Sequence, residues 1–147
     1  MGIFGKKKQD TKLAPLEGDG TFSMHAVGES FYKDDIAALV RSATREERDA
    51  CRVEKLAVLM PEPTNQYDAR AIAIIIDGRK VGHVPKSDLD IVHEVVESVQ
   101  EMGYTYPAVK AALSWAEWNP TVVGVFYDLQ YTQSDGSGCW ATMLRAA

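Results

Sequence analysis

A predicted β-hairpin in the middle of the chain constrains the fold more than any other feature. Residues 71–76 contain four isoleucines, and a second apolar segment at residues 80–84 follows after a short gap. β-Branched residues favour extended strands, and the pair Asp77-Gly78 suits a two-residue type I′ turn, in which both residues take positive φ angles. The sequence therefore predicts two antiparallel strands joined at Asp77 and Gly78.

Four further segments have the apolar character of strands. Pro61 and Pro63 end one of them, because proline cannot donate to a strand ladder. A turn is predicted at residues 118–120, where Asn119 and Pro120 interrupt an apolar region. Together with the hairpin, these segments predict about six strands. The four segments cover residues 21–27, 53–60, 105–115 and 121–131.

Two segments have the spacing of amphipathic helices. The first begins at the acidic residues 34 and 35 and loosens in the charged residues 45–49. The second ends at Gly103, and Ser87 with Asp90 forms a predicted capping box at its start. Strands outnumber helices and do not alternate with them regularly. The predicted fold class is therefore mainly β with two helices (α+β), built as a small, partly open OB-like or SH3-like β-barrel.

The two ends of the chain lack a sustained apolar pattern. Residues 1–20 mix lysines, glycines and a proline, which predicts a flexible N-terminal arm. Residues 134–138 read as a flexible link, and residues 133–147 are predicted to form a C-terminal extension. We therefore expect the barrel domain to cover residues 21–132.

Composition and charge narrow the classes of function. The chain of 147 residues is 46% hydrophobic and 25% charged, which is typical of a globular domain. No apolar run approaches the roughly 20 residues that cross a bilayer, and the first residues lack a secretory pattern. We therefore expect a cytoplasmic protein with no membrane partner. The formal net charge of −5 disfavours coating of duplex DNA, which needs a wide basic surface.

The sequence lacks the signatures of common enzyme classes. It contains no G-x-x-x-x-G-K-[ST], G-x-G-x-x-G or G-x-S-x-G pattern. His93 begins a partial metalloprotease pattern, but Glu97 stands where the second histidine belongs, so both residues are predicted to lie on the solvated face of a helix. Cys51 and Cys139 form no C-x-x-C pair. We expect no metal, no cofactor and no enzymatic activity.

Residues 63–72 form a polar loop that leads directly into the isoleucine-rich strand. Asn65 offers a donor and an acceptor, Asp68 accepts hydrogen bonds, and the ring of Tyr67 offers a flat face for a nucleobase. The same residues also suit a structural turn, in which Asp68 caps its own loop and Tyr67 packs beside the barrel. Residue types alone leave both interpretations open.

Three blocks of sequence resemble the HIRAN family of domains in order and spacing. The family core reads approximately N-x-Y-D-x-x-A-I, then a strand, a turn and G-H/Y-[LIV]-[PK]. Here residues 65–72 read N-Q-Y-D-A-R-A-I and residues 82–86 read G-H-V-P-K. Upstream, V-G-E-S-F-Y at residues 27–32 is similar to the family's V-x-G strand end with an aromatic pair. The resemblance covers residues 22–100 and indicates a stand-alone bacterial or phage-type member.

The resemblance implies an OB-like barrel that binds single-stranded DNA at its 3′-hydroxyl end. In such a site Asp68 would accept the hydrogen bond of the terminal hydroxyl, and Tyr67 and Tyr32 would flank the last bases. Asn65 would contact a base or a sugar. These roles agree with the hydrogen-bonding capacity and the flat faces of the side chains.

The resemblance assigns three further residues to the same site. Lys86 lies where the family places a phosphate-contacting lysine. Apart from the resemblance, a strand end needs only one or two phosphate contacts, and Arg70 or Lys33 is a candidate for the second. His83 either lines the pocket or serves as a structural strand residue. Phe31 is either a platform for the ligand or part of the core. Ser30 departs from the eukaryotic members, which have a basic residue at this position.

Two functions from different classes follow. The first is a nucleic-acid-binding module that captures a 3′ end of single-stranded DNA in repair, replication or defence, alongside a helicase, nuclease or other DNA-processing protein. The alternative is a protein-interaction adaptor that binds a peptide or a partner protein at the barrel mouth or at an exposed strand edge.

Overall fold

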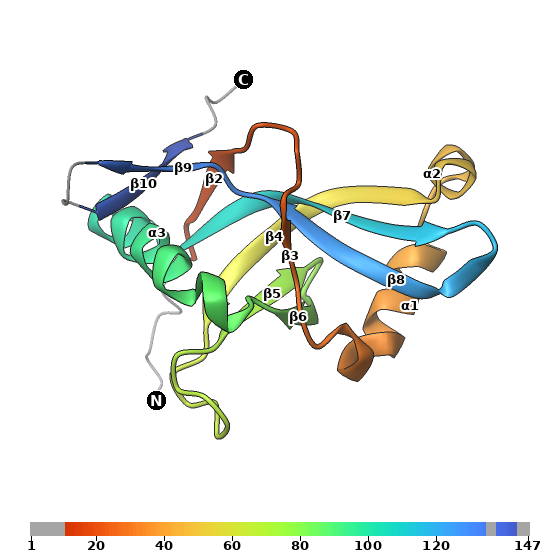
Figure 1. Cartoon of the computed structure of the whole chain (residues 1–147), viewed down its shortest axis with the longest axis horizontal. Helices are drawn as coiled ribbons and strands as arrows, with labels where there is room; N and C mark the ends of the chain where they lie inside the picture. The colour runs from red at the N-terminus through yellow and green to blue at the C-terminus, as the bar shows by residue number, and fades with distance from the viewer. Residues whose placement is uncertain (1–10, 135–137, 144–147) are drawn as a thin grey trace, which may run out of the picture.

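A computed structural model describes residues 11–134 and 138–143 of the chain. Strands dominate it, with three α-helices and two short 3₁₀-helices (Figure 1). In chain order the elements are β2 (Leu13–Glu17), β3 (Met24–His25), η1 (Glu29–Tyr32), α1 (Lys33–Arg41), α2 (Arg45–Ala50), β4 (Arg52–Pro61), β5 (Ile72–Ile76), β6 (Arg79–His83), η2 (Lys86–Asp88), α3 (Leu89–Glu101), β7 (Tyr106–Ala116), β8 (Asn119–Asp128), β9 (Tyr131–Ser134) and β10 (Gly138–Met143).

One curved sheet forms the body of the molecule (Figure 1). The strand order is β6–β5–β4–β7–β2–β10–β9, and β8 pairs with β7 on one side and β3 on the other. Just beyond β3, Val27 exchanges two backbone hydrogen bonds of 2.9 Å with His83 of β6. This single bridge links the two ends of the path β6–β5–β4–β7–β8–β3, so the sheet curls into a small, partly open barrel.

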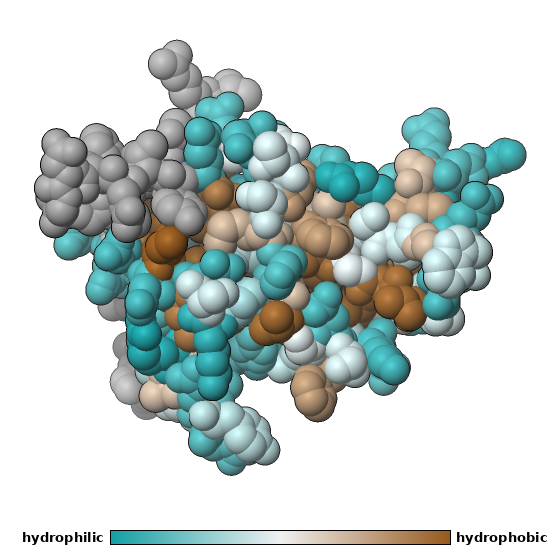
Figure 2. Space-filling view, in the orientation of Figure 1, coloured by the Kyte–Doolittle hydropathy of each residue, from teal (hydrophilic) through white to brown (hydrophobic). Residues whose placement is uncertain are grey.

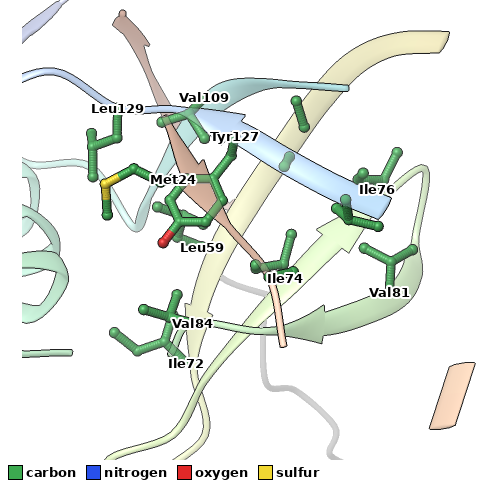
Figure 3. Close-up of a cluster of buried hydrophobic side chains, with 14 of the residues drawn as sticks. Met24, Leu59, Ile72, Ile74, Ile76, Val81, Val84, Val109, Tyr127 and Leu129 are labelled. Carbon is green, nitrogen blue, oxygen red and sulfur yellow. The ribbon is translucent and has the colours of Figure 1, made fainter. Parts of the chain in front are cut away.

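The hydrophobic core fills the inside of the curled sheet (Figure 3). β5 contributes Ile72, Ile74 and Ile76, which all have 0% exposure. Helix α3 adds an apolar stripe that includes Val92 and Val96. β5 pairs with β4 on one side and β6 on the other, and four of its five residues are buried, so it lies within the core.

The structure confirms the predicted fold class, with nine strands and three α-helices among the described residues where the sequence predicted about six and two. The hairpin of β5 and β6 is confirmed, and Asp77 and Gly78 have φ angles of 50° and 75° as a type I′ turn requires. Gly103, with φ 94°, follows the end of α3 as expected. The second hairpin turns at residues 117 and 118, and Asn119 and Pro120 already belong to β8.

Two predictions about helix ends are wrong. The charged residues 45–49 do not loosen α1 but form the separate helix α2. Thr44 and Glu47 make a capping box there, with the Thr44 amide 2.8 Å from the Glu47 carboxylate. The capping box predicted from Ser87 and Asp90 is absent, because Ser87 lies inside the 3₁₀-helix η2, which precedes α3. The N-cap residue of α3 is Asp88, and it makes no side-chain capping hydrogen bond.

The prediction of an unpacked arm is corrected for the residues of β2. Ala14 and Leu16 are buried, and β2 runs parallel to the first residues of β7. Alternate residues of β2 point into the core, as in a regular strand. The strand was not predicted because Pro15 lies between them, and proline is uncommon inside a strand. The predicted extension also contributes to the sheet, because β10 pairs with β2 and with β9. Residues 1–10, and residues 135–137 of the predicted link, lie outside the described residues.

No helix among the described residues has the length and the apolar character needed to cross a membrane.

Candidate functional site

Strand β6 lies between two segments that are far apart in the chain (Figure 1). The loop of residues 62–71, between β4 and β5, projects from the body of the molecule as a largely hydrophilic feature (Figure 2). On the other side, η1 reaches β6, and the ring centroids of Tyr32 and His83 are 5.9 Å apart. The seven residues predicted to form the DNA-binding site come from this loop, from η1, from β6 or from η2.

Two glycines allow η1 to approach β6. Gly28 precedes η1 with a φ of 78°, a left-handed conformation that glycine adopts without steric cost. A Cβ atom on Gly82 would lie 2.9 Å from the carbonyl oxygen of Val27, which is too close for any side chain. The bridge between Val27 and His83 therefore depends on a glycine at position 82.

The carboxylate of Glu62 is the centre of a polar cluster. Its Oε1 atom lies 2.7 Å from His83 Nε2 and accepts a hydrogen bond of 3.2 Å from Asn65 Nδ2. Its Oε2 atom forms an ion pair with the ammonium of Lys80, and this ammonium lies 6.0 Å from the ring centroid of Tyr32. The Glu62 side chain is only 20% exposed. The cluster thus joins the loop, β6 and η1.

The hydrogen bonds of the cluster determine the charge of Glu62. Burial raises the pKa of the carboxyl, but hydrogen bonds from Lys80, His83 and Asn65 outweigh burial and lower the pKa to about 2. The hydrogen bond to Glu62 also raises the pKa of the Lys80 ammonium. Glu62 is therefore an anion, and Lys80 a cation, throughout the neutral pH range.

Side chains of the loop itself hold its backbone. Asn65 Oδ1 accepts hydrogen bonds from the amides of Tyr67 at 2.8 Å and Asp68 at 3.0 Å, and Asp68 Oδ1 accepts one of 2.8 Å from the amide of Arg70. These contacts are typical of Asx turns. Asp68 therefore does cap its own loop, as one of the two interpretations of the sequence held.

The aromatic residues of the site differ in exposure. Tyr67 is 90% exposed at the loop tip, so it does not pack beside the barrel. Phe31 is 84% exposed and is no part of the core. Its neighbour Tyr32 is half-buried and packs against the core. Two aromatic rings are thus free to contact a ligand, and a third lies beside His83.

A second set of contacts joins the end of the loop to α3. Arg70 forms an ion pair with Asp90 at 2.7 Å, and the Arg70 carbonyl lies 2.8 Å from His93 Nε2. Glu97 is exposed as predicted, whereas His93 is partly buried and bonded to the loop, so the predicted solvated face holds for Glu97 and only in part for His93. Lys86 of η2 is exposed and forms no ion pair with any of the residues that the structure describes.

The structure brings Tyr32, Asn65 and His83 together through two residues that the sequence analysis missed, Glu62 and Lys80. Lys80 and His83 are three positions apart and would face opposite sides of a regular strand. The register of β5 and β6 shifts between Ile74 and Ile75, so β6 has one extra residue and both side chains reach Glu62. The one feature of the sequence that could have indicated Glu62 is its position between two prolines at the end of a strand.

A groove lies on the side of η1 that faces away from β6 and borders α1. It encloses about 820 Å³ between α1 and the start of β8, with Ile36, Val40 and Val122 among its lining residues. Ser30 of η1 and Lys33, one of the two additional cations predicted for the DNA-binding site, border it. Within the described part of the chain, no group of three or more His, Cys, Asp or Glu side chains is placed to hold a metal ion.

The curled sheet, the projecting loop and the exposed aromatic rings define a small barrel-type binding domain. Comparison with models of protein families identifies which one, because the model of the HIRAN domain matches residues 19–123, most of the chain. The protein belongs to the HIRAN domain family, and HIRAN domains are nucleic-acid-binding modules. No curated protein and no solved structure matched the chain in the corresponding comparisons.

Proposed function

We propose that this HIRAN domain captures the 3′-hydroxyl end of single-stranded DNA, as part of DNA repair, replication or defence. The binding site is the end-binding surface, formed by the loop of residues 62–71, η1, β6 and η2. The residues proposed to contact DNA are Phe31, Tyr32, Asn65, Tyr67, Asp68, His83 and Lys86.

The exposure of Tyr67 on a fixed loop is the observation that carries this proposal. Its ring is 90% exposed, yet the backbone beneath it is held by Asn65 and tied to α3 through Arg70. A ring held in this way can stack on a nucleobase at a low entropic cost, and such stacking contributes about 1–3 kcal/mol per base. Phe31 offers a second exposed ring across β6.

The polar groups of the surface fit a terminal nucleotide. Asp68 uses Oδ1 for the Arg70 amide, and a carboxylate has room for further hydrogen bonds, such as one from a 3′-hydroxyl. The ammonium of Lys86 is available for a phosphate. A 3′-phosphate would meet the negative charge of Asp68, so the surface favours a free hydroxyl.

The net charge of −5 is compatible with this mode of binding. A strand end requires only a few phosphate contacts, whereas proteins that coat a duplex neutralise many phosphates. Affinity then comes mainly from stacking and from hydrogen bonds to the terminus.

The direct test compares two oligonucleotides that differ only at the 3′ end. We expect the strand with a free 3′-hydroxyl to bind more tightly than the same strand with a 3′-phosphate, measured by fluorescence anisotropy at one salt concentration. Equal affinities would contradict end capture. A strand with a 5′-phosphate in place of the 3′-phosphate controls for added charge alone.

An adaptor that binds a peptide is the second candidate, because the groove between α1 and β8 has apolar side chains on both walls. A helicase, a nuclease or another DNA-processing protein would be a suitable partner. In this case the exposed Val122 should be needed for partner binding, and Tyr67 should not. The variants Val122→Asp and Tyr67→Ala separate the two functions: the first should abolish binding of a peptide partner, and the second should weaken only the binding of DNA.

A further inference from the structure

Both backbone groups of Glu62, the amide and the carbonyl, form hydrogen bonds within the loop. Its amide donates to the Ala71 carbonyl at 2.8 Å, and its carbonyl accepts from the Asn65 amide at 2.9 Å. The first of these bonds joins the two ends of the loop. The Glu62 side chain therefore starts from a fixed point at the base of the loop, next to β6.

Both carboxylate oxygens of Glu62 are engaged by the surrounding side chains. Oε2 receives the ammonium of Lys80, and Oε1 lies against His83 Nε2 and Asn65 Nδ2. An ionised carboxylate only accepts hydrogen bonds. The His83 Nε2 atom must therefore carry a hydrogen, and in the neutral imidazole Nδ1 is then the nitrogen with the lone pair.

We propose that Glu62 is the positioning residue of the end-binding surface: it holds the His83 ring with Nε2 protonated and leaves Nδ1 as the nitrogen for the nucleic acid. This inference rests on the proposed function for its ligand, but its claim about His83 does not require DNA. In neutral form Nδ1 accepts a hydrogen bond from a base or sugar, and in charged form it donates one to a phosphate.

Two further titratable groups, Lys80 and Tyr32, lie next to the pair formed by Glu62 and His83. Lys80 comes from the same strand as His83, and Tyr32 approaches from η1 with its ring centroid 5.9 Å from that of His83. The hydrogen bonds that lower the pKa of Glu62 to about 2 keep its carboxylate ionised, and therefore a hydrogen-bond acceptor, throughout the neutral pH range. Competition from Lys80 does not displace His83, because each occupies a different carboxylate oxygen.

The first experiment measures the tautomer of His83 directly. The ¹⁵N chemical shifts of the histidine side chains distinguish Nε2–H from Nδ1–H rings, and a His83→Gln spectrum assigns the signals. In the wild-type protein at about pH 9, well above the ordinary histidine pKa of about 6.5, we expect only the Nε2–H form. In Glu62→Gln the amide can donate as well as accept, so a mixture of both tautomers should appear.

The second experiment measures binding. Glu62→Gln should weaken binding of single-stranded DNA with a free 3′ end by about tenfold. The variant also loses the ion pair with Lys80 and should melt at a lower temperature, so binding is measured well below its melting transition. Glu54→Gln is the matched control, because Glu54 is a carboxylate on β4 that is ion-paired with Arg52 and is no part of the end-binding surface. This control should bind DNA like the wild type.

Three results would overturn the inference: an Nδ1–H ring in the wild type, an unchanged tautomer in Glu62→Gln, or equal DNA affinity of Glu62→Gln and Glu54→Gln. The wild-type spectrum decides the case even if Glu62→Gln does not fold. Failure of the proposed function has a different signature, since the wild type would then show no preference for a free 3′ end while His83 keeps its Nε2–H form.

Discussion

Replacing Tyr67 with alanine should separate DNA binding from folding. The ring is 90% exposed at the tip of the loop, and the hydrogen bonds that shape the loop use the Tyr67 amide rather than its side chain. Removal of an exposed side chain typically changes the free energy of unfolding by less than about 0.5 kcal/mol. We therefore expect Tyr67→Ala to melt within a few degrees of the wild type.

The expected loss of binding follows from one stacking contact. A base stacked on an aromatic ring contributes about 1–3 kcal/mol, so Tyr67→Ala should raise the dissociation constant by about 5- to 150-fold. The measurement is an anisotropy titration with a short strand that carries a free 3′-hydroxyl. Melting curves of the same samples report on the fold.

Two variants serve as controls. Trp118→Ala removes an equally exposed aromatic ring, 85% exposed at the tip of the β7–β8 hairpin, and should leave DNA affinity unchanged. Ile74→Ala removes a side chain with 0% exposure from the core and should cost about 2–5 kcal/mol of stability. If Tyr67→Ala destabilised the domain as much as Ile74→Ala, or weakened binding no more than Trp118→Ala, our assignment of the loop to DNA binding would be refuted.

Four further predictions concern charge, pH and chain length. Asp68→Asn keeps an oxygen for the Arg70 amide and removes the charge, so the preference for a 3′-hydroxyl over a 3′-phosphate should shrink in the anisotropy titration. The slope of log affinity against log salt should correspond to about one to three phosphates, and a slope for six or more would point to a different surface. The pKa of Glu62 is 4.5 before folding and about 2 after it, so its charge stabilises the native state above pH 4.5 and this contribution is lost as the pH falls towards 2. Urea unfolding should show a weaker pH dependence over this range in Glu62→Gln. A chain that begins at Thr21 lacks the buried Leu16 and should melt well below one that begins at Thr11.

The features that the sequence predicted correctly depend on residues close together in the chain. The β5–β6 hairpin follows from Asp77 and Gly78, whose positive φ angles specify the turn by themselves. Helix α3 follows from an apolar stripe that ends at a glycine. The HIRAN motifs are also local, so family membership could be identified without knowledge of the fold.

The features that the sequence left undetermined depend on contacts between distant segments. Strand β2 resembles an unpacked arm until β7 and the core cover Ala14 and Leu16. The exposure of Phe31 and the burial of Tyr32 depend on how η1 meets β6, although the two residues are neighbours in the chain. No local pattern contains this information.

The polar cluster around Glu62 shows most directly what tertiary structure decides. The sequence by itself determined that a polar loop precedes the isoleucine-rich strand and that His83 follows Gly82 in the next one. Only the paired strands determine that Lys80 and His83 share a face, because a strand alternates its faces at every residue and one extra residue in β6 shifts all that follow it. The partners of Glu62 are therefore set by the register of the sheet.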